Sequence, residues 1–136
     1  MQTQKTDNNL ELDLAQFTGS EQFYKHWLGL QYTDGVKFLA EKAKAFWLID
    51  AIASHQPRVT RKHSLTEFQL WFLHVGNIHQ FIKPRSSNAA VLTCWEDSPT
   101  PETQPVIIQQ IPFTDFPLTE VKLYLSDKIL CLPSER

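Results

Sequence analysis

The chain has 136 residues, of which 42% are hydrophobic and 21% charged, and its formal net charge is −2. This length and composition predict one globular domain and exclude a disordered chain, and the negative charge argues against a dedicated nucleic-acid binder. Residues 1–9 are polar, so we expect a flexible tail followed by a single domain over residues 10–136. No signal-like run and no apolar stretch near roughly 18 residues is present, which predicts a cytoplasmic protein without membrane contact.

The first predicted element of the domain is a short helix. Ser20 is placed to cap a helix over residues 21–28, which Gly29 would end. Phe23 and Trp27 lie four residues apart in this segment and would therefore share one helix face. We expect both side chains to pack in the core.

The longest helical pattern covers residues 34–55, after an N-cap at Thr33 or Asp34 and before the stop at Pro57. Its second half is apolar on all sides, which is typical of a helix end that is covered on more than one face. This pattern predicts one continuous central helix. Three of its side chains are expected to be mostly buried: Phe46, Trp47 and Ile49.

Strand-like segments follow a basic connector at residues 57–64, and they are residues 68–75, 89–95, 106–111, 121–125 and 128–132. The short connections between them favour an antiparallel meander, and the last two should form a hairpin with Ser126 and Asp127 at its turn. Helices followed by strands predict an α+β fold. The N-terminal helices would pack on one face of a C-terminal antiparallel sheet of about five strands.

Four segments carry a family resemblance: LAQFTGSEQFYKHWLGLQYTDGVKFLAEKAKAFWLIDAIASHQ, FQLWFLHV, TDFPLTEVKLYLSD and LPSE. Together they resemble a family of small bacterial proteins known only as a domain of unknown function and associated with plasmids and other mobile elements. The resemblance extends over nearly the whole chain after the tail. It implies a shared fold and a mobile-element setting, but it implies no activity and no catalytic residue.

Asp50 is an acid inside the apolar half of the long helix, between Ile49 and Ala51. An ionised carboxylate in an apolar environment is costly unless it is paired or hydrogen-bonded. We expect Asp50 to accept a hydrogen bond from a Trp indole, a Tyr hydroxyl or an Arg, and so to join helix and sheet. The alternatives are a functional acid or ligand contact with a raised pKa, and simple exposure to solvent.

Two groups of residues are candidates for contact with a macromolecule. Trp71 and Trp95 fall on strands, and a Trp that faces away from the helices would present a partner surface, although burial in the core is the default expectation. Arg58, Arg61 and Lys62 form a basic cluster in the connector. Such a cluster is solvated surface by default and a phosphate contact as the alternative. Because the cluster is short, we expect any nucleic-acid binding to be weak.

Side chains that support catalysis or hold a metal form no recognisable pattern in the sequence. The five His residues lack tight ligand spacing, and no glycine-rich phosphate loop or nucleophile motif is present. Cys94 and Cys131 are expected to be unpaired thiols, and Thr114 and Asp115 are expected to shape a turn. We therefore predict no catalytic residue, no metal site and no cofactor.

The resulting functional hypothesis is a small non-enzymatic interaction or accessory protein that binds a macromolecular partner or a second copy of itself. The first rival is a nucleic-acid-associated accessory of mobile elements that uses the basic cluster at residues 58–63. The second rival is a small-ligand binder or enzyme centred on Asp50. A salt-dependent shift of DNA or RNA would favour the first rival, and a deep pocket reaching Asp50 would favour the second.

Overall fold

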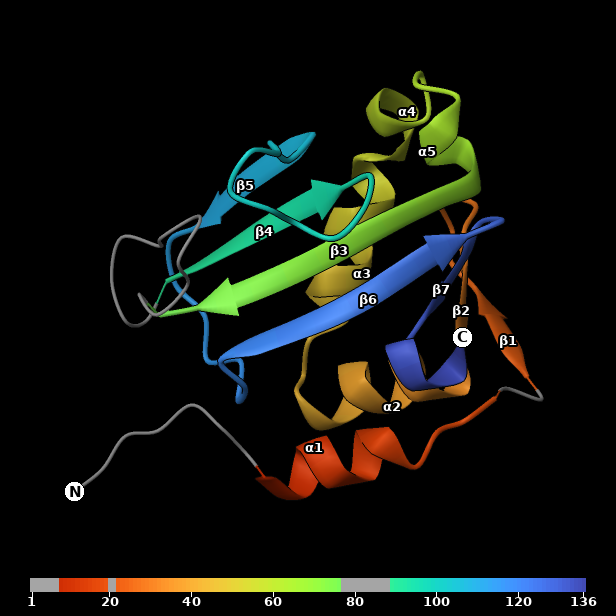
Figure 1. The fold of residues 1–136 in the computed structure, drawn as a ribbon. Helices are drawn as coiled ribbons and strands as arrows, with labels where there is room; N and C mark the ends of the chain where they lie inside the picture. Colours follow the sequence, from red (N-terminus) through yellow and green to blue (C-terminus); the bar gives the residue numbers. More distant parts are fainter. Residues whose placement is uncertain (1–7, 20–21, 77–88) are drawn as a thin grey trace.

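The computed structural model describes residues 8–19, 22–76 and 89–136, and its fold is α+β (Figure 1). A mixed sheet has seven strands in the order β1-β2-β7-β6-β3-β4-β5, and the helices that form the core with it pack on one of its faces. The α+β class is confirmed. The expected sheet of about five strands was too small, and it is not purely antiparallel because β2 and β7 are parallel neighbours. Ser20, the expected N-cap, lies outside the described residues.

The helices are α1 (Asn8–Ala15), α2 (Asp34–Lys42), α3 (Phe46–Ser54), α4 (Gln56–Val59), α5 (Ser64–Glu67) and the 3-10 helix η1 (Pro133–Glu135). The strands are β1 (Phe23–Lys25), β2 (Gln31–Thr33), β3 (Phe68–Val75), β4 (Ala90–Trp95), β5 (Ile107–Ile111), β6 (Glu120–Ser126) and β7 (Ile129–Cys131). The five strands predicted after residue 67 are thus all present. Within the described ranges, no helix is long and apolar enough to span a bilayer.

The helix predicted over residues 21–28 is wrong, because this segment forms β1 and the start of a hairpin with β2. Tyr24 lies opposite Tyr32 in the antiparallel register, and their rings stack with centroids 5.7 Å apart. The Tyr24 hydroxyl donates to the Asp34 carboxylate at 3.0 Å. On its other side β2 pairs with β7, so long-range strand pairing outweighs the local helical spacing of Phe23 and Trp27.

The predicted single helix over residues 34–55 is also wrong, because the chain breaks between α2 and α3. Lys44 adopts φ 53°, and the N–H of Ala45 bonds to the carbonyl of Ala40 at 2.8 Å. These are the features of a Schellman motif, in which a left-handed residue closes the helix end. A Lys takes the place where Gly is usual, so neither Gly nor Pro marks the break. The start of the helix was predicted well, since Thr33 Oγ1 accepts from the N–H of Val36 at 3.3 Å.

The break also changes the burial of the aromatic side chains that follow it. Phe46 becomes the first residue of α3 and is 44% exposed, so its predicted burial is wrong. Trp47 is half-buried, with its ring in edge contact with Phe116 at 6.5 Å between centroids. Ile49 is buried, as predicted. The connector at residues 57–64 is not a plain loop either, since α4 and the start of α5 lie within it.

The hydrophobic core lies between the helices and one face of the sheet. Side chains of α1, α2 and α3 meet those of the central strands there, including Leu39, Ile52, Trp71, Leu92 and Leu123. Figure 1 shows α3 crossing behind β3 and β6. Helix α3 packs against the sheet through its buried residues, while Phe46 and Asp50 on it are exposed.

The Glu135 carboxylate fastens the C-terminal segment to the start of α2. It accepts from the Thr33 hydroxyl at 2.6 Å, from the N–H of Gly35 at 3.0 Å and from the N–H of Leu132 at 2.9 Å. A carboxylate at the first turn of a helix also suits the positive end of the helix dipole. Residues 132–135 therefore hold both the hairpin and α2 in place.

Candidate functional site

The loop of the β1–β2 hairpin presents an exposed tryptophan. The N–H of His26 bonds to the carbonyl of Leu30 at 2.7 Å, and the N–H of Gly29 bonds to the carbonyl of His26 at 2.9 Å. Gly29 has φ 114°, a conformation that favours glycine. These bonds fix a tight loop whose outermost side chain, Trp27, is 81% exposed, while Leu28 beside it is exposed as well.

His26, which is buried, connects this loop to α3. Its Nε2 lies 2.7 Å from Asp50 Oδ1, and its Nδ1 accepts from the N–H of Leu28 at 3.0 Å. A ring nitrogen that accepts from an N–H carries no proton, so the neutral ring keeps its proton on Nε2 and donates it to Asp50. The expected donor to Asp50, a Trp, Tyr or Arg, was therefore wrong. The carboxylate side chain itself is 61% exposed rather than enclosed by apolar groups.

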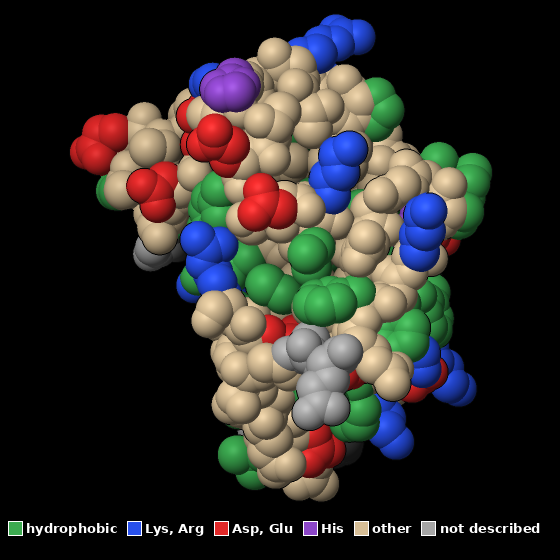
Figure 2. All heavy atoms as spheres, turned by 90° about the vertical axis from the view of Figure 1, so that its right-hand side faces the viewer, with side chains coloured by type: hydrophobic (Ala, Val, Ile, Leu, Met, Phe, Trp, Pro, Cys, Tyr) green, Lys and Arg blue, Asp and Glu red, His purple; other side chains and the backbone are tan. Residues whose placement is uncertain are grey.

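Exposed apolar side chains lie on the two elements that the His26–Asp50 bond joins, and we call Trp27, Leu28 and Phe46 the hairpin–helix patch. The Trp27 ring stacks on His26 with centroids 5.9 Å apart. Phe46 lies one turn before Asp50, on the same side of α3. Figure 2 views the molecule from the side of β1 and β2, and hydrophobic side chains reach the surface there in groups between charged ones.

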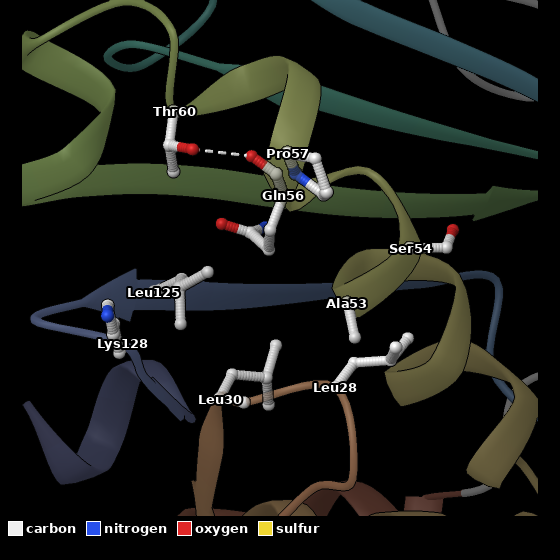
Figure 3. Close-up of a pocket in the computed structure, with 10 residues that line it drawn as sticks. Leu28, Leu30, Ala53, Ser54, Gln56, Pro57, Thr60, Leu125 and Lys128 are labelled. Carbon is white, nitrogen blue, oxygen red and sulfur yellow. Dashed lines mark hydrogen bonds between the residues drawn. The ribbon is translucent and has the colours of Figure 1, made fainter.

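A pocket of about 280 Å³ adjoins this patch and shares Leu28 with it (Figure 3). Apolar side chains from the hairpin, α3, α4 and β6 form most of its lining: Leu28, Leu30, Ala53, Pro57 and Leu125. Polar side chains complete it: Ser54, Gln56, Thr60 and Lys128. The Thr60 hydroxyl donates to the carbonyl of Gln56 at 2.7 Å, which holds the α4 wall. Asp50 is not among the lining residues, so the pocket is next to this acid but does not reach it.

The two strand tryptophans are core residues. Trp71 faces the helices, donates its indole N–H to Gln69 Oε1 at 2.8 Å and stacks on His55 at 5.9 Å. Trp95 lies on the opposite sheet face, where its indole N–H donates to Thr93 Oγ1 at 2.8 Å. Both side chains are almost fully buried. Neither one presents a surface to a partner in this conformation.

The basic cluster lies around a shallow hollow of about 420 Å³ between the connector and the start of β5. Its floor is apolar and its cations are Arg58, Arg61 and Lys62. The Lys62 ammonium pairs with the Glu96 carboxylate, whereas Arg58 and Arg61 have no acidic partner among the described residues.

The cysteines lie in separate environments. Cys94 is buried and burial raises the pKa of its thiol from 9.0 to about 12, with a smaller contribution from Glu96. Burial, followed by the charge of Glu135, also raises the pKa of the half-buried Cys131. Both thiols are free, as predicted. A thiol with a raised pKa is a poor nucleophile at neutral pH.

The predicted turn role of Thr114 also has an outcome. Thr114 Oγ1 accepts from the N–H of Phe116 at 3.1 Å, which confirms the predicted turn role of that Thr. In the part of the chain that the structure describes, no three His, Cys, Asp or Glu side chains are close enough to hold a metal ion.

Sequence reasoning missed the hairpin–helix patch because it placed Trp27 on a buried helix face. A signal was present: Phe-Tyr-Lys and Gln-Tyr-Thr are short aromatic-rich segments separated by five residues that include Gly29. Reading them as paired strands puts Trp27 and Leu28 in the loop. His26 would then stand at the hairpin end, next to a helix that carries an unexplained acid.

Comparison with known proteins gives one match. The family described as "Family of unknown function (DUF6876)" matches residues 8–136. No curated protein and no solved structure matches the chain. The matched range includes every helix and strand described above, and the chain belongs to this family of unknown function, DUF6876.

Proposed function

We propose that this protein is a non-catalytic interaction module that binds a partner protein through the hairpin–helix patch and the adjoining pocket. The observation that carries the proposal is the 81% exposure of Trp27 on a loop that is held by internal hydrogen bonds. Trp is one of the residue types enriched among interface residues that dominate binding energy. An exposed Trp beside an apolar pocket therefore fits a partner-binding surface.

The pocket supplies the second half of such an interface. Its volume of about 280 Å³ is bounded mainly by aliphatic side chains, and Leu28 forms part of both the pocket and the patch. A partner that covers Trp27 would thus be positioned to place an apolar side chain of its own in the pocket. Lys128 at the lining would favour an acidic group next to that side chain.

The hydrogen bonds of His26 support a non-catalytic role for the acid–histidine pair. Nδ1 accepts from the N–H of Leu28, and Nε2 donates to Asp50. A general base needs one ring nitrogen that can reach the proton of a substrate. Both nitrogens are engaged within the protein, so the pair acts as a brace that fixes the hairpin on α3. A fixed loop loses little conformational entropy when a partner binds.

Photocrosslinking tests this proposal. A benzophenone amino acid replaces Trp27 in one variant and the exposed Leu12 of α1 in a matched control, and both are expressed in cells that naturally contain the protein. We expect a single polypeptide to crosslink from position 27 and not from position 12. With that polypeptide purified, Trp27→Ala should weaken binding by roughly 30-fold or more without changing the melting temperature. Equal crosslinking from both positions, or unchanged affinity of Trp27→Ala, would refute the proposal.

A second candidate function is favoured by the two arginines of the basic hollow. Arg58 and Arg61 are exposed and lack acidic partners among the described residues, and an apolar floor lies between them. Guanidinium groups in this arrangement suit phosphate oxygens. We propose weak nucleic-acid binding here, which would suit a bacterial mobile-element setting. The unpaired Cys94 and Cys131 would in turn suit the reducing cytoplasm.

Fluorescence anisotropy with labelled single- and double-stranded DNA and RNA, over a series of salt concentrations, tests this candidate. The expected affinity is weak and falls with salt, and it is lost in Arg58→Gln/Arg61→Gln. The control Lys42→Gln removes an exposed Lys of α2 that lies outside the hollow. If this control weakens binding as much as the double variant, the hollow is not a specific site.

A further inference from the structure

Strand β5 lies at the other end of the sheet from the hairpin. We propose that two copies of this chain associate by antiparallel pairing of their β5 strands, which would join the two sheets across a two-fold axis. Figure 1 shows β5 at the edge opposite β1. Among the described residues, β5 has one strand neighbour, β4. Alternate backbone N–H and C=O groups of an edge strand point outward and are open to a further strand.

The composition of β5 favours such an addition. No charged residue occurs between Glu102 and Asp115, a stretch that contains the whole strand. Soluble proteins usually protect an edge with charges, particularly Lys, or with a very short strand. The opposite edge has both protections, since β1 is three residues long and ends at Lys25. The β5 edge has neither, and its Ile108 side chain is 51% exposed.

The sequence of β5 is also complementary to itself. In a pairing centred on Gln109, Ile107 would lie opposite Ile111 of the second copy, and Ile108 would lie opposite Gln110. The aliphatic pairs would extend the helix-side core, because Ile107 and Ile111 already pack there. Two uncharged β5 edges can pair without electrostatic repulsion, whereas a strongly charged partner would find no complementary charge on this edge.

Two prolines limit the length of the pairing. Pro105 precedes the strand and Pro112 follows it, and neither can donate a backbone hydrogen bond. The added ladder is therefore confined to the five residues of β5. Because a two-fold pairing uses both β5 edges, it closes as a dimer and does not propagate as a filament. Phe113, an exposed aromatic side chain, directly follows Pro112 and so lies just beyond the paired residues.

This association is separate from the proposed partner binding. The hairpin that carries Trp27 lies at the β1 end of the sheet, so a β5 dimer would leave both copies of the patch free, one at each outer end. Failure of one proposal therefore leaves the other standing. A dimer would offer two identical patches, which increases apparent affinity for a partner with repeated sites.

Sedimentation velocity of the full chain over a range of concentrations tests the dimer. We expect a concentration-dependent shift from monomer to dimer below about one millimolar. Ile108→Lys/Gln110→Lys places like charges opposite each other in the proposed register and should weaken the dimer by roughly tenfold or more. Ile108→Lys/Gln110→Glu places opposite charges there and should restore most of the affinity. Both side chains are exposed, so the monomer tolerates the substitutions.

Three results would overturn the proposal. The first is a parent protein that stays monomeric over the whole range. The second is a Lys/Lys variant that dimerises like the parent. The third is a Lys/Glu variant no tighter than the Lys/Lys variant, since only the register centred on Gln109 places residue 108 opposite residue 110. Leu12→Lys on α1 is the matched control and should dimerise like the parent, because Leu12 is exposed on a helix outside the sheet.

Discussion

Replacement of Gly35 by Ala should destabilise the protein, although Ala is the better helix former. Gly35 lies in the first turn of α2, where an added Cβ would be 2.6 Å from Leu132 Cδ1 and 2.7 Å from the carboxylate of Glu135. Separations under 3.0 Å require one of the groups to move. Leu132 is buried, and the carboxylate of Glu135 is held by three hydrogen bonds, so neither side chain can move without loss.

The magnitude follows from opposing contributions. Gly→Ala in a helix gains at most about 1 kcal/mol. Overpacking of a well-packed site costs about 1–3 kcal/mol, and displacing the Glu135 carboxylate weakens hydrogen bonds worth about 1–3 kcal/mol each when a charged group is involved. We therefore expect Gly35→Ala to lower the free energy of unfolding by about 1–3 kcal/mol, a sign opposite to helix propensity.

Urea unfolding monitored by tryptophan fluorescence measures this loss. Gly19→Ala is the matched control, because no atom lies within 4 Å of the added Cβ and its φ is not in the left-handed region. The control should change the free energy of unfolding by no more than about 0.5 kcal/mol. Gly35→Ala should also cost less in a Glu135→Ala background, because one of its two close contacts is then absent. A Gly35→Ala variant as stable as the parent would refute the reasoning.

Substitutions at three positions and a thiol modification test the brace and the core. Asp50→Asn should keep an acceptor for His26 and change stability by under about 0.5 kcal/mol, whereas Asp50→Leu should cost about 1–3 kcal/mol in urea melts; a Leu variant more stable than the parent would contradict this. Trp47→Ala should cost roughly 2–4 kcal/mol, since the side chain is half-buried, and a loss below about 1 kcal/mol would show that its contacts are weak. Thiol reagents at pH 8 should modify Cys131 slowly and Cys94 only after unfolding. The folded protein holds the Cys94 proton to about pH 12, whereas the unfolded thiol loses it near pH 9.0, so stability should fall above pH 9.0, and this part of the fall should be absent in Cys94→Ala.

The strands after residue 67 were predictable because each is an apolar run with its own boundaries. Strand β3 ends at Val75, just before Gly76, and β5 is enclosed by Pro105 and Pro112. The turn between β6 and β7 was predicted at Ser126 and Asp127, one residue too early. The turn residues are Asp127 and Lys128, and both have positive φ, as a type I′ turn requires. Local chemistry determines such elements.

The remaining elements depend on contacts between distant residues. Strands β1 and β2 have three residues each, and β2 exists because Tyr32 pairs with Leu130 of β7. The break at Lys44 has no Gly or Pro to indicate it. Because of this break, Phe46 is exposed, although it was predicted to lie in the core. For the site, the sequence identified Asp50 as unusual. Its donor, His26, could not be identified, because the pairing depends on how the hairpin packs on α3.

The attachment of β2 to the end of the chain has a consequence for biosynthesis. Thr33 and Glu135 are hydrogen-bonded although they are 102 residues apart, and β2 also needs β7 as its neighbour. A nascent chain that has released the hairpin segment but not residues 129–135 lacks β7 and Glu135, which hold β2, the second strand of the hairpin that carries Trp27. We expect partners to recognise chains that already include residues 129–135 and to ignore ribosome-bound intermediates that lack them, so that such intermediates do not compete for partners.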